Sequence, residues 1–126
     1  MCLGLGSLVD GSWRISEVQL ALLLEIGSVA TAYDPVFTGV DIEFLASLGI
    51  RVEKPKDWSG NVLYYMPHCD RSTNEEVISN IMAAGAIGKA VILGNDLRNY
   101  TMSDAQFKQV APRIYQLIHG MKIIFR

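Results

Sequence analysis

Three adjacent residues with chemically active side chains, His68, Cys69 and Asp70, follow an apolar stretch that ends at Pro67. A cysteine thiolate is a nucleophile, and imidazole and carboxylate groups transfer protons, so the triplet is the candidate catalytic group. A helix beginning directly after Cys69 would lower the pKa of its thiol. Two alternatives stay open: Cys69 is a small buried residue, and His68 is a hydrogen-bonded residue at a strand end.

A second set of residues has the types found in nucleotide sites. Gly4 and Gly6 let the backbone approach a ligand, and a helix amino terminus behind Ser7 favours an anion. Asp34 ends a short strand, where an acid commonly binds ribose hydroxyls. The match is partial, because a third glycine is absent and Asp34 follows Gly6 by 28 residues instead of the usual ~20. The hypothesis is an adenosine-containing nucleotide, with Asn95 as a further polar contact; the alternative is a tight strand-to-helix turn.

Strand and helix patterns alternate along the chain and must position these residues. Strands are expected at residues 1–5, 31–33, 50–53, 62–66, 90–93 and 121–125, and helices at 16–26, 39–48, after Thr73, and in two short pieces divided by Pro112. Such alternation predicts an α/β fold, a three-layer Rossmann-like, mostly parallel sheet with helices on both faces. Because the carboxyl ends of parallel strands share one edge, the candidate residues should meet there.

Helix starts and strand burial can also be predicted. Ser16, Thr73 and Ser103 are each followed three residues later by Gln or Glu, which predicts a capping box at each position. Strand 62–66 has no polar alternation, so we expect it inside the sheet, covered on both faces, with Tyr64 and Tyr65 packing one toward each face. Strand 90–93 is expected to be buried as well.

Size and composition limit the classes of function. The chain of 126 residues fits one domain, 1–126, and its abrupt start suggests trimming at the amino terminus. A net charge of −2 without a cluster of basic residues argues against nucleic acid as a partner. No apolar run is long enough for a membrane span. Two cysteines and two histidines, with no Cys-x-x-Cys pair, cannot form a closed zinc site, and the absence of a signal-like start predicts a reduced intracellular compartment.

The first predicted helix, residues 16–26, is apolar around most of its circumference. A surface helix needs only one apolar stripe, so another segment or another chain should cover the remainder. Self-association through this helix, or an unknown protein partner, is the expectation.

Six blocks, in order, resemble one known family: residues 3–7, 19–23, 33–37, 48–50, 65–69 and 92–95. The most specific pieces are Asp34-Pro35, Pro67-His68-Cys69 and Gly94-Asn95. Together they look like the SRR-like domain, named for sensitivity to red light reduced. The resemblance implies a regulatory protein of the cytoplasm and nucleus, acting in circadian or light signalling in plants and in haem biosynthesis and clock control in animals, with no settled catalytic activity.

Two features depart from the family pattern. Residues 70–76 are polar where the family usually has a Leu-Tyr pair, and Asp96-Leu97 replaces the usual Ser-Phe after Asn95. A Cys-Pro dipeptide of the haem-sensing kind is also absent, since Pro67 precedes the cysteine. The first hypothesis is therefore a regulatory protein with a small-ligand site at the strand ends. Its rivals are a methyltransferase-like or other nucleotide-cofactor enzyme, and a protein interaction module.

Overall fold

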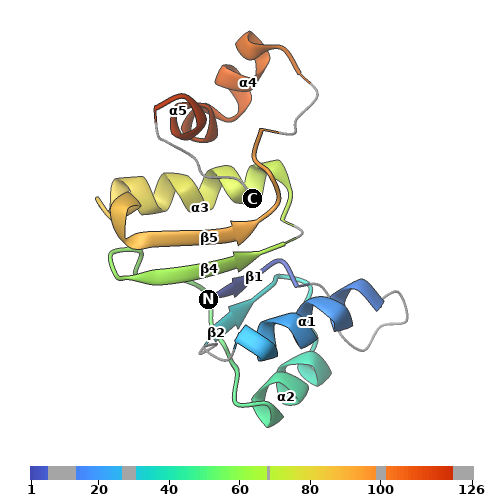
Figure 1. Ribbon diagram of the computed structural model, residues 1–126. Coiled ribbons are helices and arrows are strands. Elements are labelled where there is room, and N and C mark those ends of the chain that lie inside the picture. Colours follow the sequence, from blue (N-terminus) through green and yellow to red (C-terminus); the bar gives the residue numbers. More distant parts are fainter. Residues whose placement is uncertain (6–13, 27–30, 68, 99–101, 121–126) are drawn as a thin grey trace.

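The described strands form one parallel sheet. The computed structural model describes residues 1–5, 14–26, 31–67, 69–98 and 102–120. Its elements are β1 (Cys2–Leu3), α1 (Arg14–Ile26), β2 (Thr31–Tyr33), α2 (Gly39–Ser47), β3 (Arg51–Val52), β4 (Val62–Met66), α3 (Arg71–Ala83), the short 3-10 helix η1 (Ile87–Lys89), β5 (Ala90–Gly94), α4 (Asp104–Val110) and α5 (Pro112–Gly120). The strand order is β3-β2-β1-β4-β5, with every pairing parallel (Figure 1). The predicted α/β fold with helices on both faces is confirmed.

Alternate residues of the sheet pack against helices on opposite faces. Cys2 and Tyr65 are buried with Leu20, Leu23 and Leu45 of α1 and α2. On the other face Leu3, Tyr64 and Met66 are buried with Val77 and Ile81 of α3. The prediction that Tyr64 and Tyr65 point to opposite faces is confirmed. Figure 1 shows α4 and α5 beyond α3, on the side away from α1 and α2.

Helices α4 and α5 are held on α3 by an apolar cluster and by one carboxylate. Ile78 of α3 packs with Phe107, Ala111 and Ile114. The two carboxylate oxygens of Glu75 accept hydrogen bonds from the backbone N–H groups of Arg113 and Ile114, at 2.8 and 2.9 Å. Glu75 therefore satisfies the first turn of α5 from a different helix, a contact that the sequence does not reveal.

Two of the three predicted capping boxes are wrong. The box at Ser103 is present, and α5 begins at Pro112 as predicted. Ser16, however, lies inside α1, which starts two residues earlier at Arg14. Thr73 also lies inside its helix, because Asp70 caps α3 and accepts a hydrogen bond from the Thr73 backbone. Asp caps a helix at least as well as Thr, and Asp70 comes before Thr73 in the chain.

The prediction that strand 90–93 is buried is wrong. Ala90 and Ile92 are half-buried against the cluster of α3, and Val91 and Leu93 are 63% and 45% exposed on the opposite face, where α1 packs. Leu63, which pairs in register with Val91, is also 37% exposed. β4 is thus interior but covered on both faces over only part of its length, because α1 packs on Tyr65 and does not bury Leu63 or β5. The predicted strand 121–125 lies outside the described residues.

Candidate functional site

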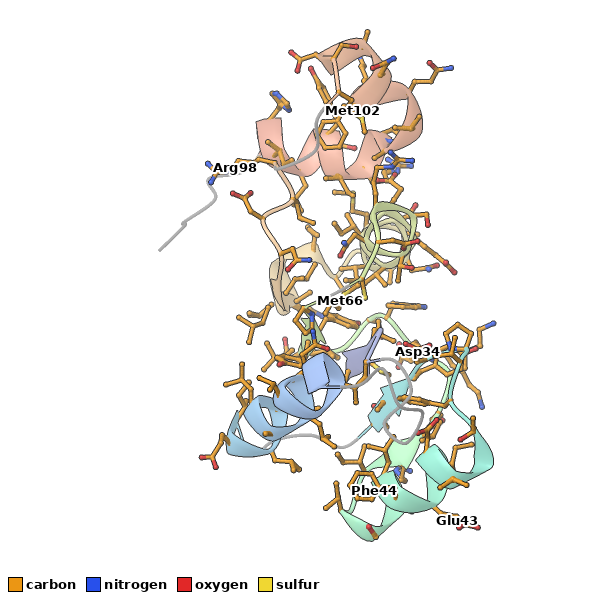
Figure 2. All side chains as sticks on the ribbon, turned by 90° about the vertical axis from the view of Figure 1, so that its right-hand side faces the viewer. Asp34, Glu43, Phe44, Met66, Arg98 and Met102 are labelled. Atoms are coloured by element: carbon orange, nitrogen blue, oxygen red, sulfur yellow. The ribbon has the colours of Figure 1, made fainter. Side chains whose placement is uncertain are left out.

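A cleft of about 880 Å³ opens at the carboxyl ends of the strands, where the strand order reverses between β1 and β4. Chain segments after β1, β2, β3 and β4 line it, together with one residue of α1. Figure 2 views the molecule from the side toward which the strands of Figure 1 point, and Asp34 lies close to the end of β1 there. Open parallel sheets bind ligands at such a reversal point.

Gly4 brings the first strand into contact with the segment after β4. Its backbone has a φ of +70°, a left-handed conformation that favours glycine. A Cβ atom built on Gly4 would lie 2.6 Å from Sγ of Cys69. Gly4 also donates its backbone N–H to the carbonyl of Tyr33 at 3.3 Å. Both the backbone conformation and the close approach of the thiol therefore explain the glycine.

Cys69 is a buried, protonated thiol in this arrangement. Its Sγ donates to the carbonyl oxygen of Leu3 at 3.4 Å. Burial, followed by the negative charges of Asp70 and Asp34, raises the pKa of the Cys69 thiol to about 11. The lowered pKa predicted from the adjoining helix is wrong, because burial of the thiol dominates and the carboxylate of Asp70 at the amino terminus of α3 opposes the helix dipole. Cys2 is a second buried free thiol, and burial raises its pKa to about 12.

Asp70 caps α3. Its Oδ1 accepts from the Thr73 backbone N–H at 2.8 Å, and its Oδ2 accepts from the Ser72 hydroxyl at 3.0 Å. These hydrogen bonds, the one from Thr73 most, hold the pKa of the Asp70 carboxyl below its ordinary value. Asp70 therefore adds a negative charge to the cleft wall at neutral pH, and its proton-transfer role stays a prediction.

Asp34 lies where the sequence predicted, directly after β2, and lines the cleft. Its Oδ1 accepts the backbone N–H of Val36 at 2.9 Å, and its carbonyl accepts that of Phe37 at 3.1 Å. This turn orients the carboxylate at the strand end. Binding of ribose hydroxyls by Asp34 stays a prediction.

The candidate residues are brought together only in part. Gly4, Asp34, Cys69 and Asp70 all line the cleft, whereas Asn95 is exposed after β5 and does not line it. In the same loop Asp96 pairs with Arg98 at 2.8 Å, and Figure 2 shows Arg98 far from Asp34. The candidates Gly6, Ser7 and His68 lie outside the described residues.

The sequence reasoning did not single out several residues of the cleft wall, among them Gln19, Lys54 and Trp58. Gln19 is a buried polar residue of α1, Lys54 follows β3, and Trp58 stacks on Tyr64 with ring centroids 5.8 Å apart. Trp58 could have been found, since it is the only large apolar residue in the polar segment 55–60. Gln19 had no comparable signal, because its spacing from Ser16 suggested a helix cap.

The described ranges contain no group of three His, Cys, Asp or Glu side chains placed to hold a metal ion. Among the described helices, none is both long and apolar enough to cross a membrane.

The parallel sheet and its reversal-point cleft define the class, a Rossmann-like α/β domain with a ligand-sized cleft at the strand ends. The family model of the SRR1 domain matches residues 1–124. The chain therefore belongs to the SRR1 domain family, which confirms the resemblance seen in the sequence. It is 29% identical over 111 residues to the SRR1-like protein of Mus musculus, covering 78% of this chain and 44% of that protein. The chain thus spans less than half the length of this relative. No solved structure matches.

Proposed function

We propose that this chain is a regulatory protein of the SRR1 family that binds a small adenosine-containing ligand in the cleft at the strand ends. The observation that carries the proposal is the joint lining of one cleft by Gly4, Asp34, Cys69 and Asp70, which come from three separate segments of the chain. A cleft with apolar walls and a few convergent polar groups is the usual form of a small-ligand site.

The biological role we propose is the one that family membership implies: regulation of circadian or light signalling, or of haem biosynthesis, in the cytoplasm and nucleus. Family membership supports this role for the whole protein, since the matched region covers only 44% of the mouse relative. In such a role, ligand binding in the cleft would be the signal to which the rest of the protein responds.

A nucleotide-cofactor enzyme is the second candidate, because Rossmann-like enzymes bind their cofactors at the same reversal point. In that case Gly4 and Asp34 would contact the cofactor, and Asp70 or His68 would transfer the proton. The raised pKa of Cys69 argues against a thiolate as the group that starts such a reaction at neutral pH.

Thermal unfolding with adenosine, S-adenosyl-L-methionine, NAD and ATP tests the proposed ligand class. A ligand present at 100 times its Kd stabilises the folded state by about 2.7 kcal/mol. For a domain of this size we expect the Tm to rise by roughly 8 °C. A chain whose Tm does not respond to any of these compounds would contradict both the proposed ligand and the enzyme candidate.

Asp34→Ala is the variant that locates the binding. We expect it to lose the ligand-induced rise in Tm, after correction for the turn that the carboxylate stabilises. Asp34→Asn keeps an acceptor for the Val36 N–H but removes the charge, so it distinguishes loss of the charge from loss of the turn. Asp96→Ala is the matched control, because Asp96 also follows a strand but lies outside the cleft and pairs with Arg98. An equal loss in Asp96→Ala would place the ligand elsewhere.

Self-association through α1 is a third proposal, which a specific surface favours. Val18 and Leu22, four residues apart on one face of α1, are 69% and 54% exposed. A second copy of the chain would cover these side chains. Sedimentation at rising concentration should show dimer formation that Leu22→Gln weakens, and a monomer at every concentration would rule it out.

A further inference from the structure

One polar group of the cleft wall has no hydrogen bond. Gln19 lines the cleft and is only 7% exposed. Its Nε2 is buried and finds no hydrogen-bond partner in the part of the chain that the structure describes. Folded proteins rarely keep a buried donor unsatisfied, because the group loses its hydrogen bonds to water on burial and forms none in their place.

The rest of Gln19 is held firmly. Its backbone carbonyl accepts a hydrogen bond from the hydroxyl of Tyr65 at 3.0 Å, in a buried contact between α1 and β4. The neighbouring Leu20 is part of the core between the sheet and α1. The backbone of Gln19 is therefore fixed at the cleft wall, and rotation of its side chain toward the cleft would bring the buried amide to an acceptor atom of a bound molecule.

The charged side chains of the described wall are predominantly acidic. Asp34, Asp70 and Glu76 line the cleft, and Lys54 is the one cation among the described lining residues. The carboxylate of Asp70 stays ionised at neutral pH, because its hydrogen bonds lower its pKa. A phosphate group carries one or two negative charges, so three carboxylates with one ammonium disfavour it.

The apolar part of the wall suits a flat ring. Trp58 lines the cleft and is half-buried, with its indole inclined by 21° to the ring of Tyr64. Tyr33, Pro35 and Pro55 add further apolar surface. Aromatic surfaces of this kind favour stacking or edge contacts with a planar heterocycle.

Resting on the proposed function, we infer that the cleft selects an uncharged or cationic nucleoside and rejects its phosphorylated forms, with Gln19 as the residue that hydrogen-bonds the heterocycle. The Nε2 of Gln19 donates to an acceptor atom of the ring, and a ribose hydroxyl donates to Asp34. The acidic wall supplies the discrimination against phosphate.

Calorimetric titration of the full chain with adenosine and AMP at low ionic strength tests the charge selection. We expect adenosine to bind at least tenfold more tightly than AMP, with a ratio that falls as salt screens the wall. Glu76→Gln should reduce the ratio, since it removes one lining carboxylate. Asp96→Asn, outside the cleft, should leave the ratio unchanged. If AMP binds as tightly as adenosine, this inference fails while the proposed function stands; if neither compound binds, the proposed ligand fails as well.

Gln19→Leu separates a recognition role from a structural one. If Gln19 had only a structural role, its replacement would lower the Tm of the ligand-free protein. Here we expect the Tm to stay level or rise, because an unsatisfied donor is removed, while adenosine affinity falls about tenfold, the equivalent of one hydrogen bond. Gln19→Met, which is unbranched like glutamine, repeats the test if leucine does not fit. Unchanged adenosine affinity in both variants would overturn the role of Gln19.

Discussion

Replacement of Gly4 by alanine should damage the fold for two reasons that can be measured separately. The φ of +70° places any other residue in the left-handed region, which costs about 1–2 kcal/mol. The added Cβ would also lie 2.6 Å from Sγ of Cys69, so the thiol or the backbone must move. Forcing extra volume into a packed site typically costs about 1–3 kcal/mol. We therefore expect the free energy of unfolding to fall by about 2–5 kcal/mol.

Gly49→Ala is the matched control for the first of these reasons. Gly49 follows α2 with a φ of +78°, and no atom lies within 4 Å of a Cβ built there. Its substitution should carry the backbone cost without the steric one. Urea unfolding monitored by circular dichroism compares the two variants, with equal m-values as the check that the denatured state is unchanged.

The double variant Gly4→Ala/Cys69→Ala isolates the steric part. Without Sγ, the nearest atom of Cys69 to the new Cβ is its Cα at 3.6 Å, an ordinary contact. The double variant should therefore be more stable than the sum of the single effects predicts, by about 1–3 kcal/mol. Additive effects, or a Gly4→Ala cost no larger than that of Gly49→Ala, would refute the close packing of β1 against the segment after β4.

Two further predictions concern the caps and the thiols. Glu75→Gln should lower the free energy of unfolding by about 1–2 kcal/mol, because one charge-assisted hydrogen bond to the first turn of α5 is lost. Glu76→Gln is the control, because Glu76 is next in sequence and exposed, and it should leave the free energy of unfolding unchanged. Equal effects of the two substitutions in urea unfolding would contradict the capping role of Glu75. The pKa values of Cys69 and Cys2 are raised to about 11 and about 12, so the stability they contribute is complete below their unfolded pKa near 9 and is lost as pH rises above it. The fall in stability between pH 9 and 11 should shrink in Cys2→Ala/Cys69→Ala, and rapid alkylation of the folded protein at pH 7 would refute the buried thiols.

Periodicity and strand-end chemistry were enough to predict the parallel sheet and the approach of Asp34 to the segment after β4. Hydrophobic patterns specify which residues form strands, and parallel connections leave little freedom in where their ends lie. The boundaries of β2 and β4 agree with the prediction residue for residue. The exposure of one face of β5 was not predictable in the same way. An unbroken apolar run predicts a strand covered on both faces, and the pattern does not show whether a helix packs on each face.

The helix caps show a different limit. Asp70, Ser72 and Thr73 can each cap a helix, and local propensity does not decide among them. The structure uses Asp70, which leaves Thr73 free to line the cleft. Glu75 and Gln19 depend on contacts with distant segments, so neither the cap on α5 nor the unsatisfied amide has any sequence pattern.

The capping role of Asp70 also determines what the cleft can do. A helix amino terminus next to a cysteine would normally stabilise a thiolate or bind an anion. Here the carboxylate of Asp70 already accepts the free N–H of Thr73 and opposes the helix dipole. After burial, which is the larger cause, the same charge also raises the pKa of Cys69, and it lies in the acidic wall with Asp34 and Glu76. The cap at Asp70 therefore makes the cleft less suited to covalent catalysis and to phosphate, and better suited to the uncharged ligand that we propose.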